Sequence, residues 1–290
     1  MTLVLTLVSQ SNDVAQLAKA APGGVGDVAD RSGSGWRVAE RAIAGGKDLV
    51  AWLEREAPRL GADWSLTPAA GRKKRLLISD MDSTIIGQEC VDELADFAGL
   101  KAEVSAITER AMRGELDFAG ALTQRVAMLK GLALSALERC HTERVRLNPG
   151  ARELVATMKA HGARTVLVSG GFGYFTSRVA KMAGFDTDRA NTLLDDGMTL
   201  TGAVGQPILG REAKLAALLE ETAALGTTAH DAVALGDGAN DLDMIRAAGL
   251  GVAYKAKPIV AAETLARIQH TDLRAALLFQ GYRIDEIVSA

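Results

Sequence analysis

The feature that most constrains the fold is an alternation of short apolar runs with longer amphipathic stretches, beginning near residue 72. Short runs of β-branched residues and Leu are typical of strands buried on both faces. Helices between such strands are typical of a parallel sheet covered on both sides. The chain therefore predicts an α/β fold with a doubly wound parallel sheet, whose candidate strands are residues 76–78, 165–168, 232–235 and 250–253.

The first part of the chain has a different pattern. A β-like run covers residues 3–8, a Gly/Ser-rich stretch covers 23–35, and a helical pattern covers 36–60. Gly71 and the basic run 72–75 are typical of a solvated linker. We therefore expect a small α+β module at 1–71, with a regulatory or dimerising role, and a larger domain at 72–290.

Residues 88–147 are helical in pattern and too long for a simple crossover between two strands. Asp117 is expected to cap a helix that ends at Gly131 and carries Leu122, Val126 and Leu129 on one apolar face. An inserted helical cap is the prediction. Asp196-Gly197, flanked by apolar residues, predicts a β-hairpin over residues 193–203, outside the main sheet.

Composition excludes several classes of protein. The 33 Lys and Arg residues nearly balance 36 Asp and Glu, and the net charge of -3 leaves no basic footprint for nucleic acid. We find no apolar run of membrane-spanning length and no signal peptide at the start. Two cysteines indicate a reducing compartment. We expect a cytoplasmic protein that binds neither nucleic acid nor membrane.

Acidic residues follow the predicted strands. In an open α/β sheet, ligands bind outside the carboxyl ends of the strands, so these residues should meet in one crevice. A cluster of carboxylates resists burial unless a cation neutralises it, and oxygen ligands without His or Cys favour Mg²⁺. Hydroxyls and glycine amides beside them suit an anion. The acidic residues are Asp80, Asp82, Asp237 and Asp241, and the anion-binding candidates include Ser83, Ser169 and Gly170.

Lys214 lies in the first turn of a predicted helix over 212–225. The helix dipole disfavours a cation there, which suggests a purpose other than helix stability. A simply solvated lysine is the alternative. Beside the acidic and glycine-rich segments, phosphate binding is the preferred interpretation.

The ordered motifs resemble those of the haloacid dehalogenase phosphatase superfamily, from about residue 73 to the end. The motifs are Asp80-Met81-Asp82-Ser83-Thr84, Ser169-Gly170-Gly171, Lys214 and Gly236-Asp237-Gly238-Ala239-Asn240-Asp241. The resemblance implies Mg²⁺ held by Asp80, the Asp82 carbonyl and Asp237, with Asp241 orienting the water around it. It also implies Asp80 as nucleophile and Asp82 as general acid and base. Ser169, Gly170 and Lys214 would hold the phosphoryl group, and Asn240 would contact the substrate.

In the cap, the resemblance assigns substrate binding to Glu89 and Arg125, which suit the ammonium and carboxylate of an amino acid. The implied reaction is hydrolysis of O-phospho-L-serine, the last step of serine biosynthesis. Phe118 and Met112 would exclude water. Simpler interpretations stay open: Glu89 could belong to a solvated acidic face, and Arg125 could form a surface salt bridge.

Two other functions also stay open. One is a related phosphatase or phosphotransferase acting on another small phosphomonoester. The other is an inactive regulatory protein that binds an amino acid.

Overall fold

The structure is a computed structural model that describes residues 2–46, 48–112 and 115–290. One predicted cap residue, Met112, ends a helix, but its side chain lies outside the described part.

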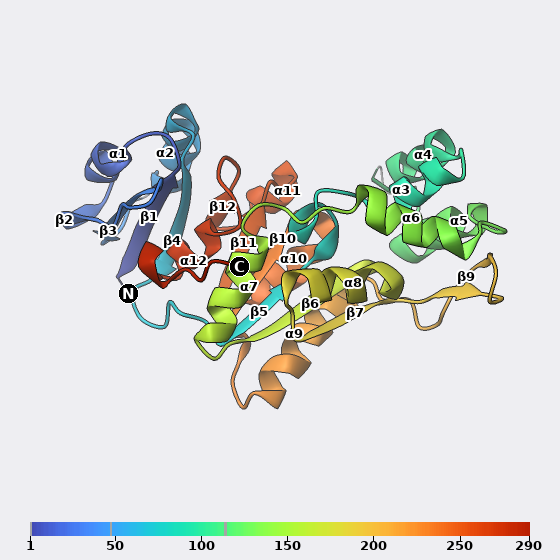
Figure 1. Cartoon of the computed structure of the whole chain (residues 1–290). Helices are drawn as coiled ribbons and strands as arrows, with labels where there is room; N and C mark the ends of the chain where they lie inside the picture. Colours follow the sequence, from blue (N-terminus) through green and yellow to red (C-terminus); the bar gives the residue numbers. More distant parts are fainter. Residues whose placement is uncertain (1, 47, 113–114) are drawn as a thin grey trace.

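One sheet of ten strands runs through the molecule in the order β2-β3-β1-β4-β12-β11-β10-β5-β6-β7 (Figure 1). From β12 to β7, neighbouring strands pair in parallel. Chain order reverses at β5, which lies between β10 and β6, so the predicted doubly wound core is confirmed. Its strands are β5 (Leu76–Ser79), β6 (Arg164–Phe172), β7 (Thr187–Asn191), β10 (Ala232–Gly236), β11 (Leu250–Tyr254) and β12 (Ala266–Ile268).

Helices cover both faces of this core because alternate side chains of a strand point in opposite directions. Leu77 of β5 belongs to the cluster packed by α7 (Ala151–Ala160), α8 (Gly173–Ala183) and α12 (Ala275–Phe279). Leu76 and Ile78 belong to the opposite cluster, with α9 (Arg211–Ala224) and α10 (Leu242–Ala247). The short helix α11 (Pro258–Ala261) follows β11.

The predicted core strands are all present, but β7 and β12 were not predicted. Their sequences, TDRAN and ARI, are short and lack an apolar run. They form strands because they pair with β6 and β11, so tertiary contacts rather than local sequence determine them.

The helical cap consists of α3 (Cys90–Phe97), α4 (Lys101–Met112), α5 (Phe118–Met128) and α6 (Leu134–Arg144). Asp117 caps α5 as predicted, because its side chain accepts a hydrogen bond from the Gly120 amide. Leu122, Val126 and Leu129 are buried.

Backbone hydrogen bonds join the cap to the core at the linkers and at the predicted hairpin. A bridge between Ile86 and Leu147 joins the two linkers. The predicted hairpin, β8 (Leu193–Asp195) with β9 (Leu200–Val204), lies outside the main sheet, and its Leu200 carbonyl accepts from the Gly131 amide. Figure 1 shows the hairpin beside the cap, at the end opposite the N-terminal strands.

The N-terminal segment contains β1 (Leu3–Ser9), α1 (Ala15–Ala20), β2 (Gly24–Asp30), β3 (Arg37–Ile43), α2 (Leu49–Glu56) and β4 (Asp63–Pro68). The predicted helix over 36–60 is therefore wrong in its first part. The apolar residues of β3 have a spacing that also fits one face of a helix. The segment nevertheless pairs with β1 and β2 as a strand. Gly45 and Gly46, with φ of 121° and 154°, separate β3 from α2. The Gly/Ser-rich stretch contains the exposed edge strand β2.

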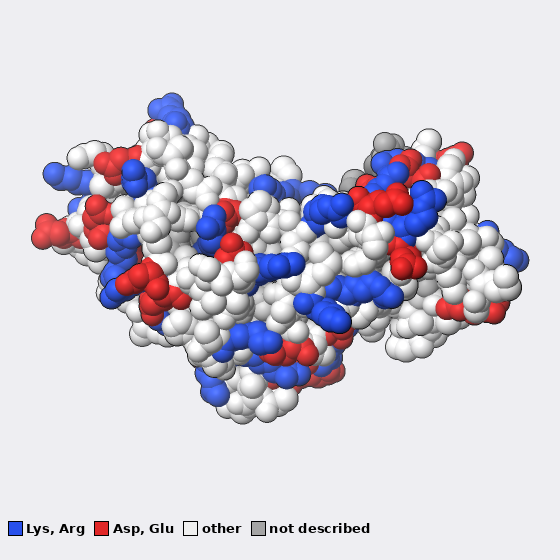
Figure 2. All heavy atoms as spheres, in the orientation of Figure 1, with Lys and Arg blue, Asp and Glu red and all other residues white. Residues whose placement is uncertain are grey.

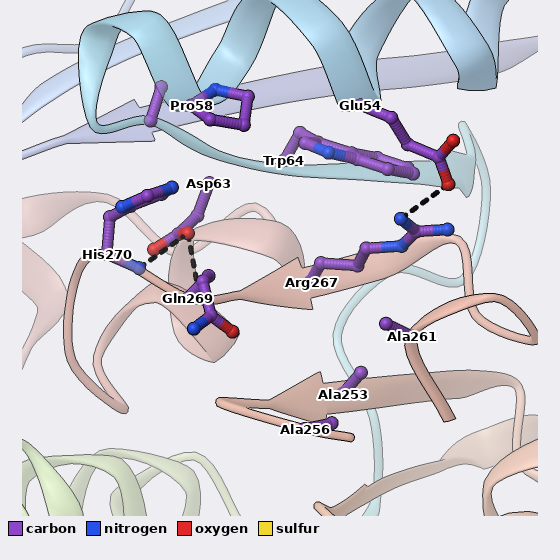
Figure 3. Close-up of a pocket in the computed structure, with 11 residues that line it drawn as sticks. Glu54, Pro58, Asp63, Trp64, Ala253, Ala256, Ala261, Arg267, Gln269 and His270 are labelled. Carbon is purple, nitrogen blue, oxygen red and sulfur yellow. Dashed lines mark hydrogen bonds and ion pairs between the residues drawn. The ribbon is translucent and has the colours of Figure 1, made fainter. Parts of the chain in front are cut away.

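The N-terminal strands continue the core sheet, because β4 pairs antiparallel with β12. Asp63 strengthens this joint: its carboxylate accepts from the amides of Gln269, His270 and Thr271 at 2.7, 3.0 and 2.8 Å. A pocket of about 280 Å³ lies beside them, where Arg267 pairs with Glu54 (Figure 3). It is lined by residues of both parts of the chain and contains none of the predicted site residues.

Arg72 forms a second contact between the two parts, so the prediction of a solvated linker is wrong at this residue. Its Nη2 donates to Glu40 Oε1 at 2.6 Å, to Thr6 Oγ1 at 2.9 Å and to the Phe279 carbonyl at 3.1 Å. Only 13% of the Arg72 side chain is exposed. A pattern of like charges does not reveal which cation finds a buried partner.

Charges of both signs are interspersed on the face shown in Figure 2. Within the described ranges, no helix is both long and apolar enough to cross a bilayer.

We expect Arg72→Met to lower the free energy of unfolding by about 2–3 kcal/mol, because Glu40 would keep only the partly exposed Arg31 as a charged partner. Urea denaturation measures the effect. Arg55→Met, which removes an exposed pair with Glu56, should leave the free energy of unfolding nearly unchanged. Equal losses in the two variants would show that Arg72 does not join the two parts.

Candidate active site

The candidate site lies where the direction of chain winding reverses, at the carboxyl ends of β5, β6 and β10. Asp80 directly follows β5, Asp237 directly follows β10, and Ser169 lies in the last part of β6. The structure thus brings together the three segments that the sequence analysis placed at one crevice.

Lys214 is the central cation of this site. Its Nζ lies 2.6 Å from Asp80 Oδ1 and 2.6 Å from Asp241 Oδ1, and only 2% of the residue is exposed. A solvated helix lysine is therefore excluded. Burial opposes the charge of Lys214, but the carboxylates of Asp241 and Asp80 outweigh it and raise its pKa.

Two carboxyl groups of this site, Asp80 and Asp237, have raised pKa values. Burial raises the pKa of Asp80 well above its usual range, and the charge of Asp241 adds to this while Lys214 opposes it. Burial, followed by the charges of Asp241 and Glu89, raises the pKa of Asp237 to about 6. These carboxylates repel one another and are not fully neutralised by one lysine, so the site favours an additional cation.

The geometry also suits a metal ion. Carboxylate oxygens of Asp80, Asp237 and Asp241 all lie within 4.8 Å of one another. Three oxygen donors without His or Cys fit a hard divalent cation. Asp241 is held in place because its Oδ2 accepts from the amides of Asp237 and Gly238 at 3.2 and 3.0 Å.

Asp82 occupies a different environment from Asp80. Its Oδ1 accepts from the Cys90 amide at 3.1 Å, and its Oδ2 accepts from Ser169 Oγ at 3.4 Å. Burial, with the charge of Glu89 second, raises the pKa of Asp82 to about 7. A carboxyl group with this pKa exchanges a proton readily near neutrality, which suits a general acid and base.

Ser83 and Glu89 lie at the mouth of the site. Ser83 has φ of 55°, a left-handed conformation that is uncommon for a residue with a side chain. Its Oγ donates to Glu89 Oε1 at 2.7 Å. Glu89 is exposed, and its charge affects both Asp82 and Asp237. It therefore faces the acidic site as well as solvent.

The glycine-rich loop Ser169-Gly170-Gly171, the irregular part of β6 between Val168 and Phe172, is shaped by close contacts. Ser169 Oγ accepts from the Gly171 amide at 2.8 Å. A Cβ on Gly170 would lie 2.8 Å from Phe118 Cζ, so the glycine makes room for this cap residue. Phe118 thereby packs against this segment of the site.

Arg125 projects from α5 toward the same region and is half-buried. Burial lowers its pKa, and the nearby carboxylates of Asp92, Glu89 and Asp82 oppose the shift. Among the side chains that the structure describes, none forms an ion pair with Arg125, which argues against the surface salt bridge. Asn240 lies in the turn after β10 and is partly exposed.

Two glycines have a structural role at the site that the sequence analysis did not state: Gly236, which it named only as part of a motif, and Gly210, which it did not name. A Cβ on Gly236 would lie 2.4 Å from Asp241 Cγ, so only glycine lets Asp241 fold back over the strand end. A Cβ on Gly210 would lie 3.3 Å from Phe118 Cδ1. The sequence signal for Gly210 was its position directly before the helix that carries Lys214.

Comparison with known proteins assigns the class. The profile of the haloacid dehalogenase-like hydrolases matches residues 77–246, and the chain belongs to this family. Similar proteins within the family include several named phosphoserine phosphatases. One from Polaromonas sp. (strain JS666) is 48% identical over 204 residues, which cover 69% of this chain and 86% of the relative.

Solved structures extend the similarity to the N-terminal segment. A HAD family hydrolase from Salmonella enterica subsp. enterica serovar Typhi superposes with a TM-score of 0.86 and 29% identity, over 96% of this chain and 98% of the other. A probable phosphoserine phosphatase from Vibrio cholerae has a TM-score of 0.78 and 31% identity, over 98% and 88% of the two chains. The superfamily expected from the motifs is confirmed.

The pKa of Asp237 predicts a pH-dependent stability in EDTA. Because the folded value, about 6, exceeds the ordinary 3.8, the folded state binds the proton more tightly and loses this contribution as pH rises through 6. Asp237→Asn should therefore gain stability relative to wild type between about pH 4 and pH 7.5, by up to about 3 kcal/mol.

Chemical denaturation at both pH values measures this difference. Asp27→Asn, at an exposed position in β2, is the matched control and should show no such trend. A constant difference between wild type and Asp237→Asn across the range would contradict the prediction.

Proposed function

We propose that this protein is a phosphoserine phosphatase, which hydrolyses O-phospho-L-serine to L-serine and phosphate with Mg²⁺. The observation that carries the proposal is the buried Lys214, which pairs with Asp80 and Asp241 at the strand ends. The relatives named phosphoserine phosphatase support the choice of substrate.

In the first step, an Asp80 oxygen attacks phosphorus and the bond to the serine oxygen breaks, leaving an aspartyl phosphate. Asp82, with a pKa of about 7, donates its proton to the departing serine oxygen. In the second step, Asp82 takes a proton from water, which attacks phosphorus and releases phosphate and the Asp80 carboxylate. Splitting the reaction in this way requires both carboxyl groups, and their different surroundings suit them to different roles.

Charge neutralisation comes from the groups around the phosphoryl position. Lys214, the Ser169 hydroxyl and the amides near Gly170 would hold its oxygens. Asp80, Asp237 and the Asp82 carbonyl would hold the Mg²⁺, and Asp241, whose oxygens accept from Lys214 and from two amides, would orient the water around it. When bound, this ion offsets negative charge on the phosphoryl group and the carboxylates.

The cap would select the amino acid. Glu89, exposed at the mouth, would pair with the substrate ammonium, and Arg125 would bind the carboxylate through its planar guanidinium. Phe118 would exclude water from the closed site. Arg125, which has no ion-pair partner among the described side chains, is available for this role.

The metabolic role of the enzyme follows from this reaction. It would perform the last step of serine biosynthesis on a small-molecule substrate. A cytoplasmic location and homodimerisation or regulation through residues 1–71 stay predictions; the exposed edge strand β2 is compatible with pairing to a second copy.

The central prediction is metal-dependent phosphate release from L-phosphoserine. Wild type with Mg²⁺ should turn over the substrate, and EDTA should abolish turnover. Asp80→Asn should lower kcat by at least about 10³-fold, because the amide is a poor nucleophile. Thermal unfolding checks that the variant is folded, and product analysis with homoserine present tests for phosphate transfer. Folded, Mg²⁺-loaded wild type without hydrolysis would overturn the proposal.

The cap assignment predicts a selective loss. Arg125→Met should reduce kcat/KM for L-phosphoserine by about 10²-fold, because a charge-assisted bidentate contact is lost. The same variant should leave p-nitrophenyl phosphate hydrolysis within about threefold of wild type, since that substrate has no carboxylate. Arg139→Met, on the exposed side of the cap, is the control. Equal losses on both substrates would assign Arg125 to the fold rather than to recognition.

A further inference from the structure

Asn191 is a buried amide at the carboxyl end of β7 that none of the proposed steps uses. Only 2% of it is exposed. Its Nδ2 donates to the Gly170 carbonyl at 2.9 Å and to the Leu209 carbonyl at 3.1 Å, and its Oδ1 accepts from the Leu209 amide at 2.6 Å. One side chain thus bonds to two separate backbone segments.

These segments carry the two parts of the proposed phosphate site. Gly170 lies in the irregular last part of β6, beside Ser169. Leu209 precedes Gly210, the N-cap residue of α9, and α9 carries Lys214 in its first turns. In the described part of the chain, no other side chain forms a hydrogen bond with Leu209 or with the Gly170 carbonyl. Asn191 is therefore the polar link between the glycine loop and the start of the Lys214 helix.

The Phe118 ring packs against the same two segments. The ring lies so close to both Gly170 and Gly210 that a Cβ on either glycine would contact it, at 2.8 and 3.3 Å respectively. The separation of the segments hence also sets where this cap residue fits. A change in the Asn191 link would alter the phosphate site and its cover together.

We infer that Asn191 is a positioning residue, which holds the Ser169–Gly170 loop and the Lys214 helix at the separation that a phosphoryl group requires. It does not contact the reacting atoms. Phosphoryl transfer depends mainly on the placement of charges and donors, so a small shift between these segments is costly. This inference rests on the proposed function and adds a residue to its site.

The test compares Asn191→Asp and Asn191→Ala with wild type, well below every unfolding midpoint. Asn191→Asp has nearly the same shape but loses both donated hydrogen bonds. We expect kcat/KM to fall about 10–100-fold in both variants. The loss should be equal for L-phosphoserine and p-nitrophenyl phosphate, because the disturbed groups bind the phosphoryl part that the two substrates share. This pattern differs from the selective loss expected of Arg125→Met.

A matched control is Gln280→Leu. Gln280 is fully buried, and its side chain donates to the Ala276 carbonyl at 3.0 Å and accepts from the Lys74 amide at 3.1 Å, away from the site. It should lower stability while leaving kcat/KM within about twofold. This control thereby distinguishes the general effect of removing a buried amide from the specific effect of removing the hydrogen bonds of Asn191.

Binding of inorganic phosphate in the presence of Mg²⁺, measured by calorimetry, gives a readout that needs no turnover. The Asn191 variants should bind phosphate at least about tenfold more weakly than wild type and Gln280→Leu. Unchanged phosphate affinity or unchanged kcat/KM in folded Asn191→Asp would overturn the inference, as would a loss confined to L-phosphoserine. If wild type hydrolyses neither substrate, the proposed function fails, and the phosphate affinities still decide the role of Asn191. Wild type that hydrolyses neither substrate and binds no phosphate would overturn both.

Discussion

The buried pairing of Lys214 with Asp80 and Asp241 is the interaction on which the site depends. Three carboxylates gather at the ends of β5 and β10, and burial makes each one costly unless a positive charge lies close to it. Lys214 supplies that charge from a third element, α9, and so ties the helix to both strand ends. The proposed Mg²⁺ would complete the neutralisation. Beside this lysine, burial and the charge of Asp241 still raise the pKa of both Asp80 and Asp237.

The work of the site is divided between two layers of the molecule. The core supplies every group proposed to act on the phosphoryl part, including Asp80, Asp82 and Lys214. The cap supplies Arg125 and Phe118, while Glu89 lies on the linker between the layers. The layers meet where Phe118 fits against two glycines. Asn191 bonds to both glycine segments and so fixes their spacing. A residue at the end of a short strand would therefore matter for the chemistry.

The N-terminal segment is joined to the core through the sheet itself. β4 pairs with β12, Asp63 accepts from three consecutive amides, and Arg72 reaches from the linker to Glu40 and the Phe279 carbonyl. Because hydrogen bonds and a buried ion pair cross this joint, the segment is held against the core in one arrangement. The similarity to a Vibrio cholerae structure over nearly the whole chain is consistent with this arrangement.

Local sequence alone determined the four core strands that we predicted, the helical nature of the cap and the set of acidic residues at the strand ends. Apolar runs, helix caps and polar strand endings are local signals, and the carboxyl-edge rule converts them into a site. Tertiary structure decided the rest. Residues of β3, β7 and β12 have weak strand patterns and became strands through their neighbours. Lys214, Arg72 and Asn191 each have partners distant in the sequence. The sequence indicated a phosphate-binding role for Lys214, but it did not reveal the partners of any of the three, since the energy of a buried polar group depends on what surrounds it.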